Sequence, residues 1–292
     1  MELGLNGKVV VVAGGSKELA RAIAVELARE GAQVAIFSRD SAYLDQTAQE
    51  VGQNGGKLFA SLADITDEAQ VVAFMNKVAT DFGGIDVLIN CAGRTNPDTF
   101  ANLSDDGWAA DFDVKLLGMV RCTRAALPHL RRSRAARVIN VNSVLGLRPQ
   151  PEFTSSSAIR AACIGLSRTL ALQFAADNIL VNSVNVGFME AQHWQKAWMR
   201  SGKQITIEQF SEGLTAAVPL GRLGKPEEAA ALIVFLAGSR SSYITGASFD
   251  VSGGMLWLAA DQWLTNEVTY ANEDREQHGA GQCALAALCD QP

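Results

Sequence analysis

Residues 8–20, KVVVVAGGSKELA, decide the fold of this chain, because a run of valines leads through two glycines directly into a helix-forming segment. The β-branched run predicts a buried strand over 8–13, and the pattern after it predicts a helix over 18–30 that ends at Gly31. A glycine-rich turn at a helix N-terminus presents backbone N–H groups to an anion, and Gly14 and Gly15 permit its close approach. The stretch therefore predicts a phosphate cradle.

Strands and helices alternate along the rest of the chain. We predict further strands at 33–38, 57–61, 86–90, 136–142, 179–184 and 248–251, with helices from 41 and over 67–82, 106–131, 155–175 and 226–237. This alternation is typical of α/β proteins and predicts a Rossmann-type, doubly wound sheet of seven parallel strands in a single domain. The domain spans 1–258, an irregular segment at 188–223 interrupts the alternation, and a polar tail occupies 259–292.

The composition excludes several classes of function. Hydrophobic residues make up 48% of the 292 residues and the net charge is −6, which argues against a nucleic-acid surface. We interpret the one basic cluster, Arg131, Arg132, Arg134 and Arg137, as a solvated connection, with a phosphate-bearing ligand as the alternative. The chain shows no secretion signal, membrane span, cysteine pairing pattern or metal motif. We therefore expect a cytoplasmic protein without a metal.

Three further patterns predict a dinucleotide site at the carboxyl ends of the strands. FSRD at 37–40 places Ser38 and Arg39 where NAD-specific sites usually have a carboxylate. Arg39 and Lys17 can together bind a 2′-phosphate, which favours NADP(H), although both are alternatively ordinary surface cations. LADITD at 62–67 places Asp64 to accept a hydrogen bond from the adenine amino group, and INCAG at 89–93 brings small residues against the adenosine.

In this order and spacing, these motifs resemble the short-chain dehydrogenase/reductase family over 5–256, with AGGSKELA in place of its TGxxxGxG and INCAG in place of its NNAG. The resemblance implies a homotetramer, or a dimer, built from the helices at 106–131 and 155–175 and the C-terminal segment. It also implies a set of cofactor-binding residues. These are Gly14, Ser16, Lys17, Leu19, Ser38, Arg39, Asp64, Ile65, Asn90, Ala92, Gly93, Arg160 and Gly187.

The chain departs from the family pattern near the nicotinamide end of this site. Glu18 and Ala20 replace two glycines of the loop, and the Glu18 carboxylate is expected to repel a pyrophosphate. Val186 and Ala191 replace a proline and a threonine that help to position the nicotinamide. We therefore expect an intact adenosine end and an altered nicotinamide end.

The resemblance implies a catalytic set in which only one family residue is kept. Ser143 is the serine that orients the substrate oxygen, and thirteen residues later Ser156 occupies the tyrosine position. Arg160 replaces the lysine, and Lys115 replaces the asparagine, a place where polyketide-synthase ketoreductases also have lysine. Of the three tyrosines, Tyr43, Tyr243 and Tyr270, only the last is a conceivable substitute, from a neighbouring subunit.

These replacements favour reactions that need no strong acid at the tyrosine position. Ser156 is a poor acid, and Arg160 stays protonated but can bind the ribose hydroxyls and stabilise an oxyanion. The hypothesis is an NADP(H)-dependent reductase of an activated C=C, C=N or carbonyl group. The resemblance implies a substrate lid at about 188–223, where Trp194 and Trp198 indicate a bulky hydrophobic substrate. The alternatives are a non-redox lyase, isomerase or cyclase, or a non-catalytic binding subunit.

Overall fold

The computed structural model describes residues 2–14, 17–93, 98–191, 194, 198–199, 206–216 and 218–255, and for Lys17 only the backbone. The predicted contributions of Ser16, Tyr270 and the tail at 259–292 lie outside the described residues. Within the described ranges, no helix is long and apolar enough to cross a membrane.

The core of the fold is a seven-stranded sheet whose neighbouring strands are all parallel, in the order β3-β2-β1-β4-β5-β6-β7. Its strands are β1 (Val9–Ala13), β2 (Gln33–Ser38), β3 (Leu58–Leu62), β4 (Val87–Asn90), β5 (Arg137–Ser143), β6 (Leu180–Val186) and β7 (Ser248–Val251). This topology confirms the predicted doubly wound sheet. The strand order reverses between β1 and β4, and ligands of such sheets bind beyond the carboxyl ends of the strands at that switch point.

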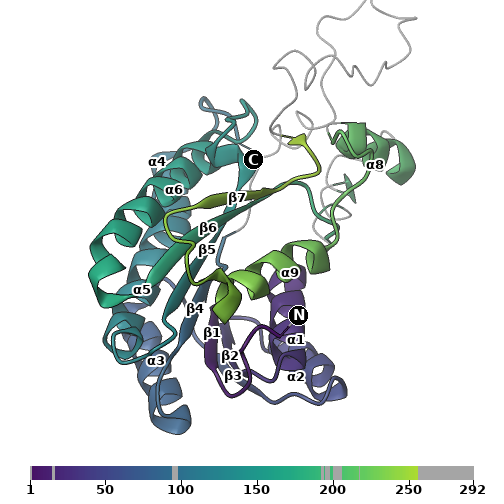
Figure 1. Ribbon diagram of the computed structural model, residues 1–292. Coiled ribbons are helices and arrows are strands. Elements are labelled where there is room, and N and C mark those ends of the chain that lie inside the picture. Colours follow the sequence, from purple (N-terminus) through teal and green to yellow (C-terminus); the bar gives the residue numbers. More distant parts are fainter. Residues whose placement is uncertain are drawn as a thin grey trace, which may run out of the picture.

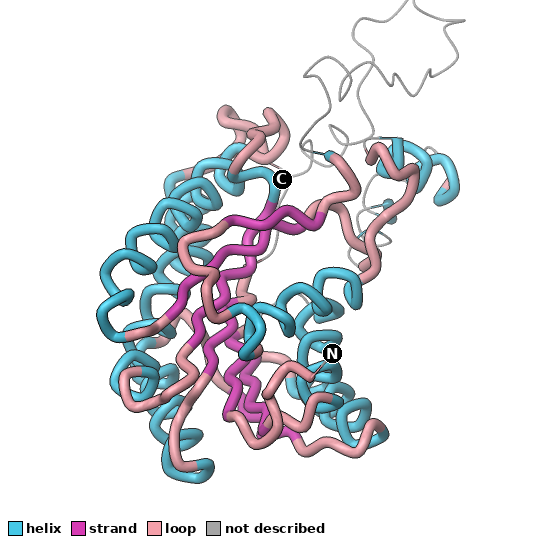
Figure 2. Tube along the Cα trace, in the orientation of Figure 1, coloured by secondary structure: helices cyan, strands magenta, loops and turns pink. Residues whose placement is uncertain are grey.

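Helices cover both faces of the sheet (Figures 1 and 2). One face carries α1 (Lys17–Arg29), α2 (Ser41–Gln53) and α9 (Pro226–Ala237), and the other carries α3 (Glu68–Phe82), α4 (Asp105–Phe112), α5 (Gly118–Leu130) and α6 (Thr154–Phe174). The valines of β1 are divided between the two cores: Val10 and Val12 pack on one side, and Val9 and Val11 on the other. Burial on both faces explains why β1 is a continuous apolar run.

The predicted helix at 106–131 contains an interruption. A π-helical turn, η1 (Asp113–Leu117), separates α4 from α5, and Lys115 lies within it. Such turns are rare and often occur at functional sites. The short 3₁₀ turns η2 (Val144–Gly146), η3 (Ala175–Asp177) and η4 (Ser239–Ser241) follow β5, α6 and α9.

Two other predictions need correction. Arg137 does not belong to a solvated connection: it begins β5, is 6% exposed, and burial lowers its pKa. The segment at 188–223 is not irregular throughout, because Ile207–Ala216 forms α8 with Phe210 and Leu214 buried. Hydrogen bonds between Phe188 or Glu190 and Gly224 join the two ends of this segment.

Candidate active site

The turn after β1 meets the loop after β4 through Gly14. Its φ is 65°, and a Cβ there would lie 2.7 Å from the Cβ of Ala92. Glycine is thus required both by conformation and by space, as expected of a cradle that admits a pyrophosphate. Leu19 is 5% exposed and packs in the core, so only its backbone remains available to a ligand.

Two predicted residues for the adenosine meet at the ends of β2 and β3. Arg39 is largely exposed and lies 3.4 Å from Asp64, a long contact that leaves the guanidinium accessible. Burial raises the pKa of Asp64, but hydrogen bonds from Thr66 and the charge of Arg39 outweigh it and bring that pKa below its ordinary value. Asp64 is therefore a carboxylate acceptor beside an exposed cation, while Ile65 packs in the core.

The structure brings Lys115 and Ser156 into direct contact. The Nζ of Lys115, in η1, donates to the Oγ of Ser156, in the first turns of α6, at 2.7 Å. Both residues are buried, at 3% and 1% exposure, and Lys115 also forms an ion pair with Asp111 one turn earlier. The Lys115 ammonium and the Ser156 hydroxyl, which was predicted to occupy the tyrosine position, are thus joined directly.

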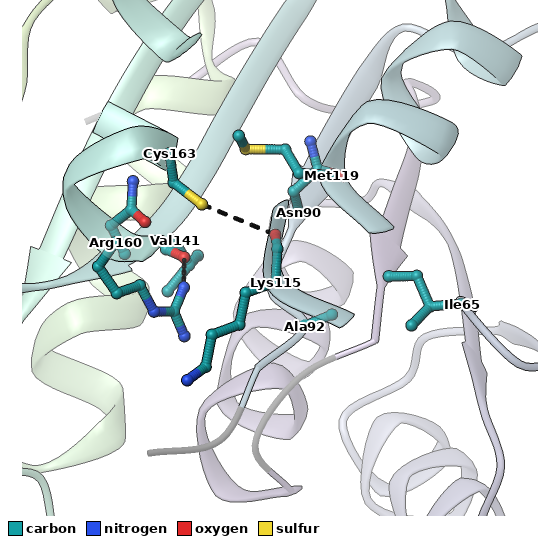
Figure 3. A pocket seen from close by; sticks show the side chains of 9 residues that line it. Ile65, Asn90, Ala92, Lys115, Met119, Val141, Arg160 and Cys163 are labelled. Carbon is teal, nitrogen blue, oxygen red and sulfur yellow. Dashed lines mark hydrogen bonds between the residues drawn. The ribbon is translucent and has the colours of Figure 1, made fainter. Parts of the chain in front are cut away.

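Arg160 lies one turn after Ser156 and connects α6 to the loop after β4. Its Nη1 donates to the carbonyl of Val141 at 3.0 Å, and a Cβ at Gly93, whose φ is 134°, would clash with its guanidinium. The same Cβ would come within 3.2 Å of the Cγ of Lys115. Gly93 therefore lets the two cationic side chains converge beside the predicted cofactor site (Figure 3).

A small cavity of about 10 Å³ lies among these groups, close to the space that a single water molecule needs. It is lined by Ile65, Asn90, Ala92, Lys115, Met119, Val141, Asn142, Arg160 and Cys163. Three buried atoms of this lining have no hydrogen-bond partner: the Nε of Arg160 and the Oδ1 atoms of Asn90 and Asn142. The cavity has polar groups in its lining, but it is too small for an organic substrate.

Ser143 stands apart from the other three predicted catalytic residues. It ends β5, is partly exposed, and its Oγ accepts from the backbone N–H of Leu145 at 3.3 Å. Within the described residues it makes no hydrogen bond to Lys115, Ser156 or Arg160.

Electrostatics makes Lys115 an unusual lysine. Burial, followed by the charge of Arg160, lowers its pKa from 10.5 to about 8, against the opposing influence of Asp111 and Asp98. A lysine with such a pKa exchanges its proton much closer to neutral pH than an exposed one does. The site therefore contains a proton donor.

Three polar residues of this site were not predicted from the sequence. Asp111 pairs with Lys115, and the Oγ of Ser155 lies 2.7 Å from carboxylate oxygens of both Asp111 and Asp98. The i, i+4 spacing of Asp111 and Lys115 was a usable signal. Asp98, by contrast, lies 57 residues from Ser155 in the chain and outside the named helices and strands, so no periodicity marks it.

The two described tyrosines lie away from the cavity. Tyr43 is buried at the start of α2, and burial raises the pKa of its phenol, while Tyr243 is fully exposed before β7. Neither lines the cavity that Lys115 and Arg160 share.

The segment after β6 begins with aromatic packing. Gly187 follows β6, and a Cβ there would come within 2.8 Å of Ser252 and Met255. Phe188 packs edge-on against Trp194 with ring centroids 5.3 Å apart, and the Trp194 indole donates to the carbonyl of Met189. A second cavity, of about 260 Å³, is lined by Phe188, Met189, Leu220, Arg222, Gly224, Glu228, Asp250, Val251, Ser252 and Gly253.

Comparisons with known proteins give a consistent result over most of the chain. A family model described as enoyl-(acyl carrier protein) reductase matches residues 13–256. The 3-oxoacyl-[acyl-carrier-protein] reductase FabG of Thermotoga maritima is 33% identical over 252 residues, covering 86% of this chain and 99% of the relative. The corresponding FabG of Vibrio cholerae is 31% identical over 256 residues, covering 88% of this chain and all of the relative.

Solved structures are similar to this chain over about the same share of its length. An NADPH-bound short-chain oxidoreductase of Pseudomonas aeruginosa PAO1, described as containing an atypical catalytic center, is 35% identical with a TM-score of 0.81, covering 88% of this chain and 99% of the other. The L-sorbose reductase of Gluconobacter frateurii, complexed with NADPH and L-sorbose, is 28% identical with a TM-score of 0.84, covering 89% of this chain and all of the other.

Proposed function

This chain belongs to the short-chain dehydrogenase/reductase family of NAD(P)-dependent oxidoreductases, and we propose that it uses NADP(H) to reduce an activated C=C, C=N or carbonyl group of a bulky hydrophobic substrate. The observation that carries the proposal is the 2.7 Å hydrogen bond from Lys115 to Ser156. It supplies a proton source at the position where the family has its tyrosine.

Lys115 and Ser156 act together as the proton donor. Because the Oγ of Ser156 accepts a hydrogen bond from Lys115, its own hydrogen is free to point towards a substrate atom. As Ser156 releases that hydrogen, Lys115 replaces it, so the serine never has to become a free alkoxide. The lysine, with its pKa of about 8, sets the acidity of the pair.

The remaining groups stabilise charge. The reduced nicotinamide supplies the hydride when the cofactor is bound. Arg160 and Ser143 then stabilise the negative charge that develops on a carbonyl or enolate oxygen. A C=N substrate that already carries a positive charge needs only the hydride, so the weak acid suffices. This set of residues therefore fits substrates that are activated before they bind.

Preference for NADP(H) rests on Arg39. The guanidinium is exposed at the end of β2, where a 2′-phosphate lies in folds of this kind, and its contact with Asp64 is long. Gly14 and Gly93 provide the close backbone approach that the pyrophosphate and the nicotinamide ribose require. The NADPH bound in the Pseudomonas and Gluconobacter proteins supports the same choice.

The segment after β6 supports a bulky hydrophobic substrate. Phe188, Trp194 and Met189 form an apolar group at its start, and Phe188 and Met189 also line the larger cavity. Large apolar side chains are also exposed on α6, at Leu172, and on α4, at Phe112. We propose that the enzyme is cytoplasmic and assembles as a homotetramer, or as a dimer, through the faces that carry these side chains.

The proposal is tested by titrating the protein with NADPH and NADH while tryptophan fluorescence is recorded. We expect NADPH to bind at least about tenfold more tightly, because Arg39 pairs with the additional phosphate. NADPH consumption is then measured with panels of enones, imines and ketones. Absence of binding overturns the proposal, and binding without consumption favours a non-redox enzyme or a non-catalytic subunit.

A further inference from the structure

A serine lies between two buried carboxyl groups beside the proposed proton donor. The Oγ of Ser155 is 2.7 Å from an Oδ2 of Asp98 and 2.7 Å from the Oδ2 of Asp111. The backbone N–H of Ser155 also donates to the other oxygen of Asp98 at 3.2 Å. Ser155 is 1% exposed and each aspartate 8% exposed, so solvent screens this contact only weakly.

The hydrogens in this cluster can be counted. A serine hydroxyl carries one hydrogen and donates it to one acceptor at a time. Two ionised carboxylates on either side of one hydroxyl would also repel each other in a buried site. Both short contacts are favourable together only if the second carboxyl carries a hydrogen and donates it to the Oγ of Ser155.

The positions of the cations show which carboxyl is ionised. The Oδ2 of Asp111 that faces Ser155 also accepts from the ammonium of Lys115. An oxygen that already faces a cation is the better acceptor, so Ser155 donates to Asp111 and accepts from Asp98. Among the residues that the structure describes, Lys115 from η1 interacts electrostatically with Asp98, Asp111 and Arg160 from α6.

We propose that Asp98 and Asp111 hold one proton between them through Ser155, and that this trio returns a proton to Lys115 after each turnover. The first part stands on geometry alone, and the second rests on the proposed function. Asp98, Ser155 and Asp111 are positioning residues, since they act on the substrate only through Lys115.

The transfer balances at every atom. After Lys115 has given a proton to Ser156, the hydrogen on Asp98 moves to the Oγ of Ser155. The hydrogen that Ser155 held moves to the Oδ2 of Asp111 and from there to the Nζ of Lys115. Asp98 remains as a carboxylate and takes its next proton from water, and no electrons or heavy atoms are exchanged.

Infrared spectroscopy of the protein without cofactor tests the shared proton directly. At neutral pH, the wild type should show the C=O stretch of a protonated buried carboxyl, and Asp98→Asn should lack it. Asp105→Asn, which removes an exposed carboxylate from the first turn of α4, is the matched control and should keep the band. Absence of the band in the wild type, or its survival in Asp98→Asn, overturns the proposal.

A second variant tests the shared proton if Asp98→Asn does not fold. Ser155→Ala removes the hydroxyl that accepts from Asp98, so the carboxyl band should shift or vanish, and an unchanged band contradicts the shared proton. Neither measurement uses a substrate or cofactor. If NADPH does not bind but the carboxyl band is present, the proposed function is refuted and the shared proton is not.

The relay is tested by kinetics with a substrate found in the panels. Asp98→Asn should lower kcat by roughly tenfold and alter its pH profile, while KM and NADPH affinity stay unchanged, because only the return of the proton is impaired. Asp98→Glu should restore part of the rate, since it again carries a transferable proton. Equal loss in both variants, or a wild-type pH profile in Asp98→Asn, contradicts the relay.

Discussion

The two ends of the site are built on different physical principles. At the adenosine end the requirements fall on the backbone: Gly14 allows a close approach that any Cβ would block, and the exposed Arg39 adds a charge. At the catalytic end the requirements fall on buried side chains, with Lys115 held between Asp111 and Ser156. A backbone cradle tolerates many side-chain replacements, whereas a buried charge requires its partners. The cofactor site can therefore keep its form while the chemistry beside it changes.

Substitution of Lys115 should impair turnover but not NADPH binding, which is the largest difference that we expect between the two ends of the site. Lys115→Met should reduce turnover by about 100-fold or more, because the proton donor is gone, while NADPH binding persists. It should also lower the free energy of unfolding by about 3–5 kcal/mol, since Asp111 loses its buried partner. Steady-state rates and urea unfolding measure the two effects.

The double variant Asp111→Asn with Lys115→Met is the matched control. It should regain most of the lost stability, because no unpaired charge remains, and it should stay as inactive as the single variant. Wild-type turnover in either protein would remove Lys115 from the mechanism.

The pH dependence of the rate should follow Lys115. In the proposed mechanism the protonated lysine is the donor, and its pKa is about 8, so the rate of reduction should be level below that pH and fall about tenfold per pH unit above it. NADPH affinity, measured over the same range, should not show this fall. A rate that stays level well above pH 8 would assign the proton to another group.

Substitution of Arg39 should affect only cofactor binding at the adenosine end. Arg39→Ala should weaken NADPH binding by about tenfold and leave NADH binding nearly unchanged, because only NADPH carries the 2′-phosphate. Arg124→Ala, which removes an exposed arginine of α5, is the control and should change neither affinity. Equal weakening with both cofactors would show that Arg39 does not recognise the phosphate.

Substitution of Glu18 should have the smallest effect, a modest change in NADPH affinity. It is partly buried in the first turn of α1, the helix that follows the turn after β1. Glu18→Gln should strengthen NADPH binding by a few-fold, because repulsion of the pyrophosphate is removed. Isothermal titration of both proteins measures the difference, and weaker binding by the variant would mean that Glu18 helps to hold the cofactor.

Most of the fold could be predicted from the sequence because its signals are local. The valine run of β1 reports burial directly, and the boundaries of β2, α9 and β7 were predicted to the residue. The glycine positions also carried information, since Gly14 and Gly93 need backbone angles or space that other residues lack. The resemblance to the family, carried by these motifs, also placed Lys115, Ser156 and Arg160 in one site.

Only the tertiary structure decided what those residues do together. It introduced the π-helical turn that holds Lys115, buried Arg137 in β5, and formed α8 in a segment that was predicted to be irregular. It also joined Ser155 to Asp98 and Asp111, partners 57 and 44 residues away in the chain. Periodicity records which face of an element is buried, but the pairing of buried polar groups depends on elements that meet only after folding.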